Sequence, residues 1–337
     1  KTNKNYISLK GGPIFMELKK IIEEIKAERP EITSVIFVGC GASQAELYPA
    51  KYFLEGNAKK LRTSLYTANE FVHATPACVG KESIIITCSL GGNTPETVEA
   101  SKKAMNMGAK VIAITHTPGS PLANSAHYVV LHGFEKNYAA KLEKMTFCLQ
   151  LAAEILNQYE GYEHYQDMMT GFGKIFDLIE DAVSFVVPSA KKFAENYKDA
   201  PVIYVMSSGA THMVAYSFSI CLLMEMQWIN SGSFHDGEFF HGPFEIVDKD
   251  VPFLLLMNDG STRALDSRAL DFLNRFQAKT TLIDAKDFGL GSVIPSTVKD
   301  YFNPMLITAV LRVYAEQLAI LRNHPLTQRR YMWKLEY

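Results

Sequence analysis

Two ionisable residues sixteen positions apart, Glu225 and His241, have the residue types of an acid–base pair. Glu225 is surrounded by apolar residues between positions 220 and 226, so a helix over this stretch would bury part of the carboxyl group. Burial disfavours the charged form and raises a carboxyl pKa toward the range that suits a general base. His241 precedes Gly242-Pro243 in an aromatic-rich stretch, and histidine titrates near neutral pH. The two residues therefore indicate proton-transfer chemistry.

Both residues also have a purely structural interpretation. Glu225 could lie on the polar stripe of a surface helix, and His241 could be a core histidine with satisfied hydrogen bonds. Glu238 and Glu245 are further acidic candidates in the same stretch. Glu245 could instead begin a helix or pair with one of the two arginines at positions 329 and 330.

A segment of small polar residues follows the apolar, β-branched residues 83–88, which predict a buried strand. Helical spacing resumes at 97–107, and a strand–turn–helix junction points free backbone N–H groups at a ligand. Glycine lets the backbone approach closely, while hydroxyl and amide groups donate further hydrogen bonds. The segment thus predicts a phosphate-binding loop, with an ordinary turn capped by Thr94 as the alternative. Its candidate ligands are Ser89, Gly91, Gly92, Asn93 and Thr94.

A second glycine turn, Gly41-Ala42-Ser43, follows a strand expected at 32–38. Cys40 lies in this turn and could be a nucleophile, although a small residue facing the core or ligand is the plainer interpretation. The five cysteines show no CxxC spacing and no neighbouring histidine pattern, so we expect no metal site.

Apolar strands alternate with helical segments through the first 130 residues, which predicts a parallel sheet with helices on both faces. The further strands are expected at 61–67, 110–116 and 128–132. A continuous helical pattern then runs from about 141 to 197. It would join the first half of the chain to a second half.

The second half repeats the first. Gly41 and Gly209 lie 168 positions apart, and so do Gly92 and Gly260, each after an apolar strand. Two strand–turn–helix units at one offset indicate an internal duplication, with residues 221–247 interpreted as departing from it. Asp259 in the second half would repel a phosphate, so the anion site is expected in the first half.

Composition limits the partners. The net charge is −2 and no basic block occurs, which disfavours nucleic acid and anionic membranes. The longest apolar runs are strand-sized, so no membrane span is expected, and no secretory pattern is present. An odd number of scattered cysteines indicates reduced thiols and a cytoplasmic location.

Three motifs together resemble the double sugar isomerase (SIS) domain proteins, which include the isomerase part of glucosamine-6-phosphate synthase. They are Gly-Cys-Gly-Ala-Ser at 39–43, Ser-x-x-Gly-x-Thr-x-Glu at 89–96 and Gly-Glu-x-x-His-Gly-Pro at 237–243. The details at 237–247, 251–254 and in the tail from 329 are most similar to deglycases of 6-phosphorylated sugar–amino-acid adducts. That group includes fructoselysine-6-phosphate, fructose-asparagine-6-phosphate and glucoselysine-6-phosphate deglycases.

The resemblance implies roles for individual residues. The turn with Ser43 and the loop 89–94 would hold the phosphate, and Glu225 would be the base that moves a proton between sugar carbons. His241 would open the ring or protonate the departing amine, entering the site from a neighbouring subunit, so a homodimer is expected. Lys334 would correspond to a C-terminal lysine near the site and is the third candidate catalytic residue. No cofactor is implied, because the chemistry is enolisation and imine hydrolysis.

The resemblance also implies an α/β fold of two tandem SIS domains. We expect domain 1 at 13–158, a helical bridge at 159–198, domain 2 at 199–325, and a tail at 326–337 near the active site. Synthase-like members have serine at the position of Gly91, so one phosphate donor is missing here. An aldose–ketose phosphosugar isomerase, a sugar-phosphate deaminase and a non-catalytic phosphosugar-binding regulator remain alternatives to the deglycase.

Overall fold

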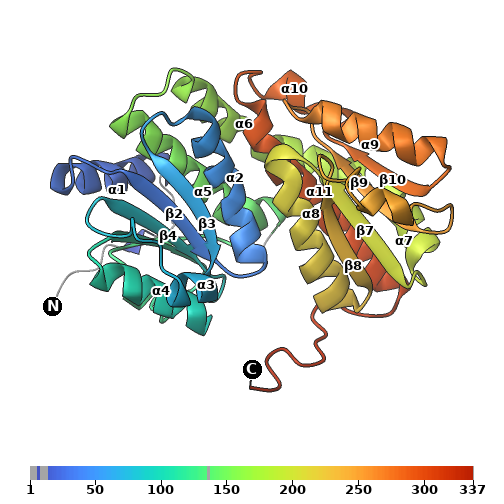
Figure 1. Ribbon diagram of the computed structural model, residues 1–337, viewed down its shortest axis with the longest axis horizontal. Helices are drawn as coiled ribbons and strands as arrows, with labels where there is room; N and C mark the ends of the chain where they lie inside the picture. Colours follow the sequence, from blue (N-terminus) through green and yellow to red (C-terminus); the bar gives the residue numbers. More distant parts are fainter. Residues whose placement is uncertain (1–5, 8–13, 135–136, 337) are drawn as a thin grey trace. The chain divides into compact units, whose positions relative to one another are not determined.

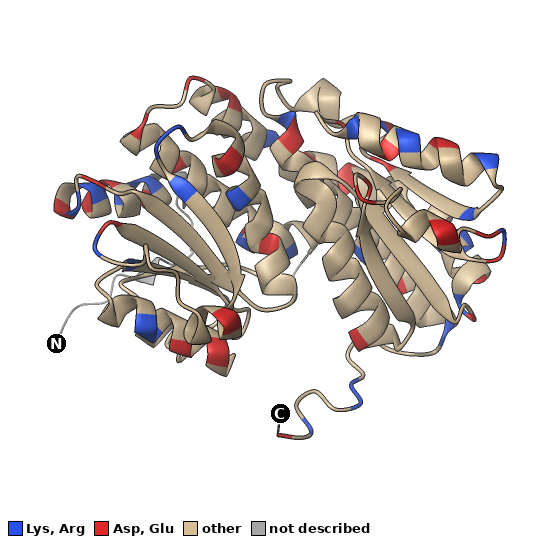
Figure 2. Ribbon diagram, viewed as in Figure 1, with Lys and Arg blue, Asp and Glu red and all other residues tan. Residues whose placement is uncertain are grey.

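The computed structural model describes residues 6–7, 14–134 and 137–336. The chain forms two compact units, Lys1–Met169 and Thr170–Tyr337, each built on a parallel β-sheet with flanking helices. The expected α/β class is therefore confirmed. Charged side chains gather on helices and loops, while the strands of both sheets are largely free of them (Figure 2).

The described part of the first unit contains a six-stranded sheet in the order β1-β6-β5-β4-β2-β3. All neighbouring strands run parallel, and β2, β4 and β5 are buried along their whole length, as their apolar sequences require. The strands are β1 (Tyr6–Ile7), β2 (Ser34–Gly39), β3 (Arg62–Thr67), β4 (Ser83–Cys88), β5 (Lys110–Thr115) and β6 (Tyr128–Leu131).

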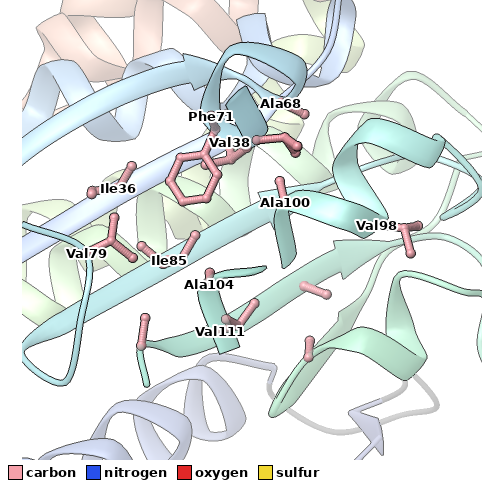
Figure 3. Packing of buried hydrophobic residues seen from close by; sticks show 14 of the residues in the cluster. Ile36, Val38, Ala68, Phe71, Val79, Ile85, Val98, Ala100, Ala104 and Val111 are labelled. Atoms are coloured by element: carbon pink, nitrogen blue, oxygen red, sulfur yellow. The ribbon is translucent and has the colours of Figure 1, made fainter. Parts of the chain in front are cut away.

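Helices cover both faces of this sheet, with α1, α2 and α5 packed together on one face and α3 and α4 on the other (Figure 1). On the second face Phe71 is fully buried among side chains of β2, β4 and β5 (Figure 3). Ala100 and Ala104 let α4 lie close to the sheet. The helices are α1 (Ile14–Glu28), α2 (Ala42–Asn57), α3 (Ala68–His73), α4 (Pro95–Asn106), the short η1 (Ala123–Ser125) and α5 (Tyr138–Tyr159).

The second unit contains a four-stranded parallel sheet in the order β10-β9-β7-β8. Its strands are β7 (Val202–Ser207), β8 (Asn230–His235), β9 (Pro252–Met257) and β10 (Lys279–Asp284). Its main helices are α6 (Tyr165–Phe185, which begins in the first unit), α7 (Val187–Tyr197), α8 (His212–Ser217), the π-helix η3 (Phe218–Met226), α9 (Arg263–Arg275) and α11 (Asn303–Leu321). Shorter elements are η2 (Gly209–Thr211), η4 (Pro243–Ile246), η5 (Ala285–Phe288), α10 (Leu290–Val293) and η6 (Lys299–Phe302).

The pairing of strands gives further evidence for the internal duplication, beyond the repeated glycine turns. Ser34 pairs with Arg62 between β2 and β3, and the residues 168 positions later, Val202 and Asn230, pair between β7 and β8. The interpretation of 221–247 as a departure from the repeat is therefore wrong for β8. That strand escaped prediction because its sequence, Asn-Ser-Gly-Ser-Phe-His, is polar and forms a half-exposed edge.

Helix α11 is an exception to the expectation that no apolar run reaches a membrane-spanning length. Among the described residues, Lys299–Leu321 is long and apolar enough by composition, but 67% of its apolar window is buried inside the protein. The helix packs along α7 in the interior of the second unit. Its hydrophobicity is that of a core helix.

Candidate functional site

The two predicted anion-binding turns of the first unit lie at one edge of the sheet. Strands β2 and β4 are parallel neighbours, and Gly39 at the end of β2 pairs with Cys88 at the end of β4. Gly41 immediately precedes α2 and has φ 55°, a conformation that favours glycine. Ser43, in the first turn of α2, hydrogen-bonds with Cys88, where burial raises the pKa of the thiol.

The loop after β4 is held in shape by its neighbours. The Leu90 carbonyl accepts hydrogen bonds from the His116 N–H at 2.8 Å and the Thr115 hydroxyl at 3.0 Å. Gly92 has φ 67°, and a Cβ atom there would lie only 2.1 Å from the Ser120 Oγ. Glycine at 92 is thus required both by backbone conformation and by close packing.

This loop carries several hydrogen-bond donors. The hydroxyls of Ser89 and Thr94 lie 2.9 Å apart. Within the described residues, the N–H groups of Gly91 and Asn93 have no hydrogen-bond partner. A Cβ atom at Gly91 would meet only the Asn93 amide at 3.6 Å, so the loop has room for the serine of synthase-like proteins. The arrangement suits an anion at a helix N-terminus.

In the second unit, the protein's own carboxylates occupy the equivalent turns. Asp266 is buried and accepts hydrogen bonds from the Ser208 hydroxyl and from the Asn258 N–H (2.9 Å) and side-chain amide (2.6 Å). Asp259 pairs with Lys299 at 2.8 Å. These donors are already used, which supports the first unit as the place of the anion site.

Glu225 lies near the end of the π-helix η3, a helix type that is rare and frequent at functional sites. Its side chain is 21% exposed, so it is neither a surface glutamate nor fully buried. The Arg329 Nη2 lies 2.7 Å from the Glu225 Oε1. Burial raises the pKa of Glu225, and the charge and hydrogen bond of Arg329 oppose that rise.

Arg329 is held in place by the tail that carries it. Its Nη1 donates to the carbonyls of Leu326 and Gln328, both at 2.8 Å, and the Lys334 Nζ donates to the Arg329 carbonyl at 2.6 Å. The suggested pairing of an arginine with Glu245 is wrong for Arg329, because Glu225 takes that place. Sequence reasoning did not pair Arg329 with Glu225, since the two are far apart in the chain.

A pocket of about 550 Å³ lies beside this ion pair. It is formed wholly by the second unit, from the end of η3, the start of β8 and the C-terminal tail. Neither Lys334 nor His241 lines it. Its lining residues are Met224, Glu225, Trp228, Ile229, Asn230, Arg329, Arg330, Tyr331, Met332, Leu335 and Glu336.

His241 and Glu238 are exposed in the turn that follows β8. The His241 N–H donates to the Glu238 carbonyl at 2.9 Å, so the two belong to one local turn. In the described part of the chain no contact joins His241 to Glu225. The structure of one chain therefore brings Glu225 and Arg329 together but leaves His241 apart from them.

A second pair of acids, Asp236 and Asp266, was missed by sequence reasoning. Asp236 is 2% exposed, and burial followed by its hydrogen bond with Asp266 raises its pKa. Burial thus favours the protonated form of Asp236. The repeat carried a signal: 168 positions earlier stand Ala68 and Val98, both in the apolar core of the first unit.

Cys40 is half-buried with its Sγ 3.9 Å from the Thr97 Oγ1. Among the described residues, no group of three or more His, Cys, Asp or Glu side chains is placed to hold a metal ion.

Comparison with known proteins defines the class to which this architecture belongs. Residues 31–153 match the SIS domain family. A crystal structure of a protein from Salmonella typhimurium LT2 is 43% identical with a TM-score of 0.93, covering 99% of this chain and all of that one. The chain belongs to the SIS-domain family, and the expected tandem SIS fold is confirmed.

Two relatives are similar over nearly the full length. The chain is 41% identical to Fructosamine deglycase FrlB of Bacillus subtilis (strain 168), covering 95% of this chain and 97% of that protein. It is 24% identical to Fructoselysine 6-phosphate deglycase of Escherichia coli (strain K12), covering 92% of this chain and 88% of that protein. The resemblance drawn from the motifs is thus confirmed at the level of the family.

Proposed function

We propose that this protein is a deglycase that cleaves 6-phosphorylated sugar–amino-acid adducts to a hexose 6-phosphate and a free amino acid. The observation that carries the proposal is the 41% identity, over almost the whole chain, to a fructosamine deglycase. The half-buried carboxyl of Glu225 beside a pocket supports it, because enolisation needs a base with a raised pKa.

The phosphate of the substrate binds the turns of the first unit. Ser43, Ser89 and Thr94 supply hydroxyl donors, and the free N–H groups of Gly91 and Asn93 add backbone donors. Binding at this group, remote from the reacting carbons, supplies binding energy and orientation for the chemical step.

Glu225 then moves one proton on the ring-opened ketosamine. It removes the proton from C1, and the electron pair forms the C1–C2 double bond of an enaminol. Return of a proton to C2 gives an imine at C1, and addition of one water molecule releases the amine and leaves an aldose 6-phosphate. The reaction is balanced with water as the only co-reactant.

His241 opens the sugar ring or protonates the departing amine, and acts on the site of a neighbouring copy of the chain. Its exposure and its separation from the Glu225 pocket within one chain support this role. We therefore infer a homodimer. Lys334 hydrogen-bonds the Arg329 carbonyl and supports the tail near Glu225. A cytoplasmic location is supported by the five free cysteines.

Replacement of the base tests the proposed reaction directly. Glu225→Gln should lower amino-acid release at least about 100-fold, since general base catalysis contributes roughly 10²–10⁴. Phosphosugar binding, measured by calorimetry, should survive. Glu195→Gln is the matched control, because Glu195 is an exposed glutamate of α7 outside the proposed site. Normal release by the Glu225 variant would contradict the assignment.

A mixing experiment tests the shared site. His241→Ala should lose at least about tenfold in turnover. In a dimer with shared sites, refolding equal amounts of Glu225→Gln and His241→Ala chains should restore about a quarter of wild-type activity, since half the dimers carry one complete site. No recovery from two stable, correctly folded variants would speak against a site shared between subunits.

Product identity separates the alternatives. Release of ammonia instead of an amino acid would indicate a deaminase, and interconversion of hexose phosphates without amine release would indicate an isomerase. Tight phosphosugar binding without turnover of any adduct would indicate a regulator.

A further inference from the structure

The pocket beside Glu225 contains a second arginine in a specific stacked arrangement. The guanidinium carbon of Arg330 lies 4.4 Å from the centre of the Trp228 ring. Trp228 has φ 56°, uncommon for a bulky residue, and its ring meets the His324 ring edge-on at 4.4 Å. Trp228 therefore has a strained backbone conformation, and both its indole and Arg330 line the pocket.

The two arginines that line the pocket differ in their interactions with carboxylates. Arg329 forms the ion pair with Glu225, whereas Arg330 has no ion-pair partner among the described residues. A guanidinium that stacks on an indole keeps its N–H groups free at the edge of its plane. Those groups form a fork that matches a carboxylate. The pocket therefore offers one unused anion-binding group close to the proposed base.

The rest of the lining is mostly hydrocarbon. Aliphatic, thioether and aromatic side chains form the walls, while Asn230 and Glu336 are the other polar members. Such walls fit a non-polar side chain of variable shape, and methionine in particular adapts to different partners. The pocket thus combines apolar walls with Arg330, the lining arginine that has no ion-pair partner among the described residues. This combination fits an α-amino-acid moiety, which joins a variable side chain to a constant carboxylate.

We propose that this pocket is the subsite for the amino-acid part of the substrate, and that Arg330, stacked on Trp228, binds its free carboxylate. The inference rests on the proposed deglycase function and adds the leaving-group class to it. It implies that the enzyme accepts adducts of several amino acids but discriminates against adducts of amines that lack a carboxylate.

Paired substrates test this subsite. We would compare the 6-phosphorylated fructose adduct of valine with that of isobutylamine, which is valine without its carboxylate. Wild type should show a kcat/KM at least about tenfold higher for the valine adduct, since a charge-assisted hydrogen bond contributes roughly this much. In Arg330→Gln the ratio should fall close to one, mainly through KM of the valine adduct. Arg275→Gln is the matched control, because Arg275 stacks on Phe276 at 5.3 Å outside the pocket.

A binding measurement keeps the test independent of turnover. Both adducts reduced at C2 to the alcohol cannot enolise, yet they retain the phosphate and the amine substituent. Calorimetry should show the reduced valine adduct binding at least about tenfold more tightly than its isobutylamine counterpart to wild type and Arg275→Gln, and equally to Arg330→Gln. A preference that survives in Arg330→Gln, or equal binding to wild type, would overturn the subsite. Failure of wild type to cleave either adduct while this binding pattern holds would overturn only the deglycase function.

Discussion

Two opposing effects act on the pKa of the Glu225 carboxyl group, namely its burial and its contact with Arg329. Partial burial favours the neutral acid and raises the pKa, while a guanidinium 2.7 Å away favours the carboxylate. Burial prevails, so Glu225 is a stronger base than an exposed glutamate. The arginine opposes the rise and so favours the carboxylate, the form that accepts a proton.

Removal of this arginine should therefore shift the pH dependence of the reaction. In Arg329→Leu the pKa of Glu225 should rise further, because the interaction that favours its charged form is lost. The base would then become protonated at a higher pH, and the acid limb of the kcat/KM profile should move to higher pH. The measurement is kcat/KM for amino-acid release from pH 4.5 to 8.5.

Arg329→Lys is the control, since it keeps a positive charge while losing the planar fork. Its acid limb should lie between those of wild type and Arg329→Leu. If Arg329 had a merely structural role, its replacement would lower kcat/KM without shifting the acid limb of the pH profile. An unshifted acid limb would therefore contradict an effect of Arg329 on the pKa of Glu225.

Helix α6 shows how a single glycine can set the distance between two elements. Gly171 faces the ring of Phe302, and a Cβ atom there would lie 2.4 Å from the Phe302 Cζ. At Gly173, two positions along the same helix, an added Cβ atom would have no neighbouring atom within 4 Å. The two glycines thus share a helix and differ in packing.

Alanine at these two positions should have opposite effects. Gly171→Ala should lower the free energy of unfolding by about 1–3 kcal/mol through overpacking against Phe302. Gly173→Ala should raise it by up to about 1 kcal/mol, because alanine favours the helix and meets no neighbour. Urea unfolding of both variants measures the difference. Equal effects of the two substitutions would show that the Phe302 contact does not fix the position of α6.

Elements with a strong local pattern could be predicted from the sequence, and others could not. The β-branched run at 83–88 gave β4 with its observed bounds, because a buried parallel strand needs continuous apolar residues. The π-helix η3 has no such pattern, since nine largely apolar residues fit an α-helix equally well. Glu225 was nevertheless found as a candidate, because a charge inside an apolar run requires an explanation.

Long-range partners were the hardest to predict. Nothing local connects Arg329 with Glu225, or Asp236 with Asp266, and both pairs are made by the fold. The second pair could have been found by placing the two halves in register, because acids then align with apolar core positions. The internal repeat is thus a stronger guide to unusual residues than the residues' own neighbours are.

At the scale of the whole molecule, the two units share strand register but differ at the carboxyl edge of their sheets. Among the described residues, the first unit has hydroxyl groups and N–H groups without a partner at this edge, and the second satisfies the equivalent donors with Asp266. An acid introduced there needs compensation, because a buried carboxylate is costly unless it is paired or protonated. Burial raises the pKa of Asp236 and so favours its protonated, uncharged form.

That proton makes the stability of the protein depend on pH. The pKa of Asp236 is raised in the folded state, so between its ordinary value and the raised value the folded chain binds one more proton than the unfolded chain. Stability must then fall as pH rises, by up to about 1.4 kcal/mol per pH unit.

Asp236→Asn mimics the protonated acid and cannot lose its proton, so its stability should fall less steeply. Urea unfolding from pH 6 to 9 should show that the free energy of unfolding of the variant increases relative to that of wild type at each higher pH. Asp271→Asn, an exposed change on α9, should run parallel to wild type. Parallel curves for Asp236→Asn as well would mean that burial does not raise the pKa of Asp236.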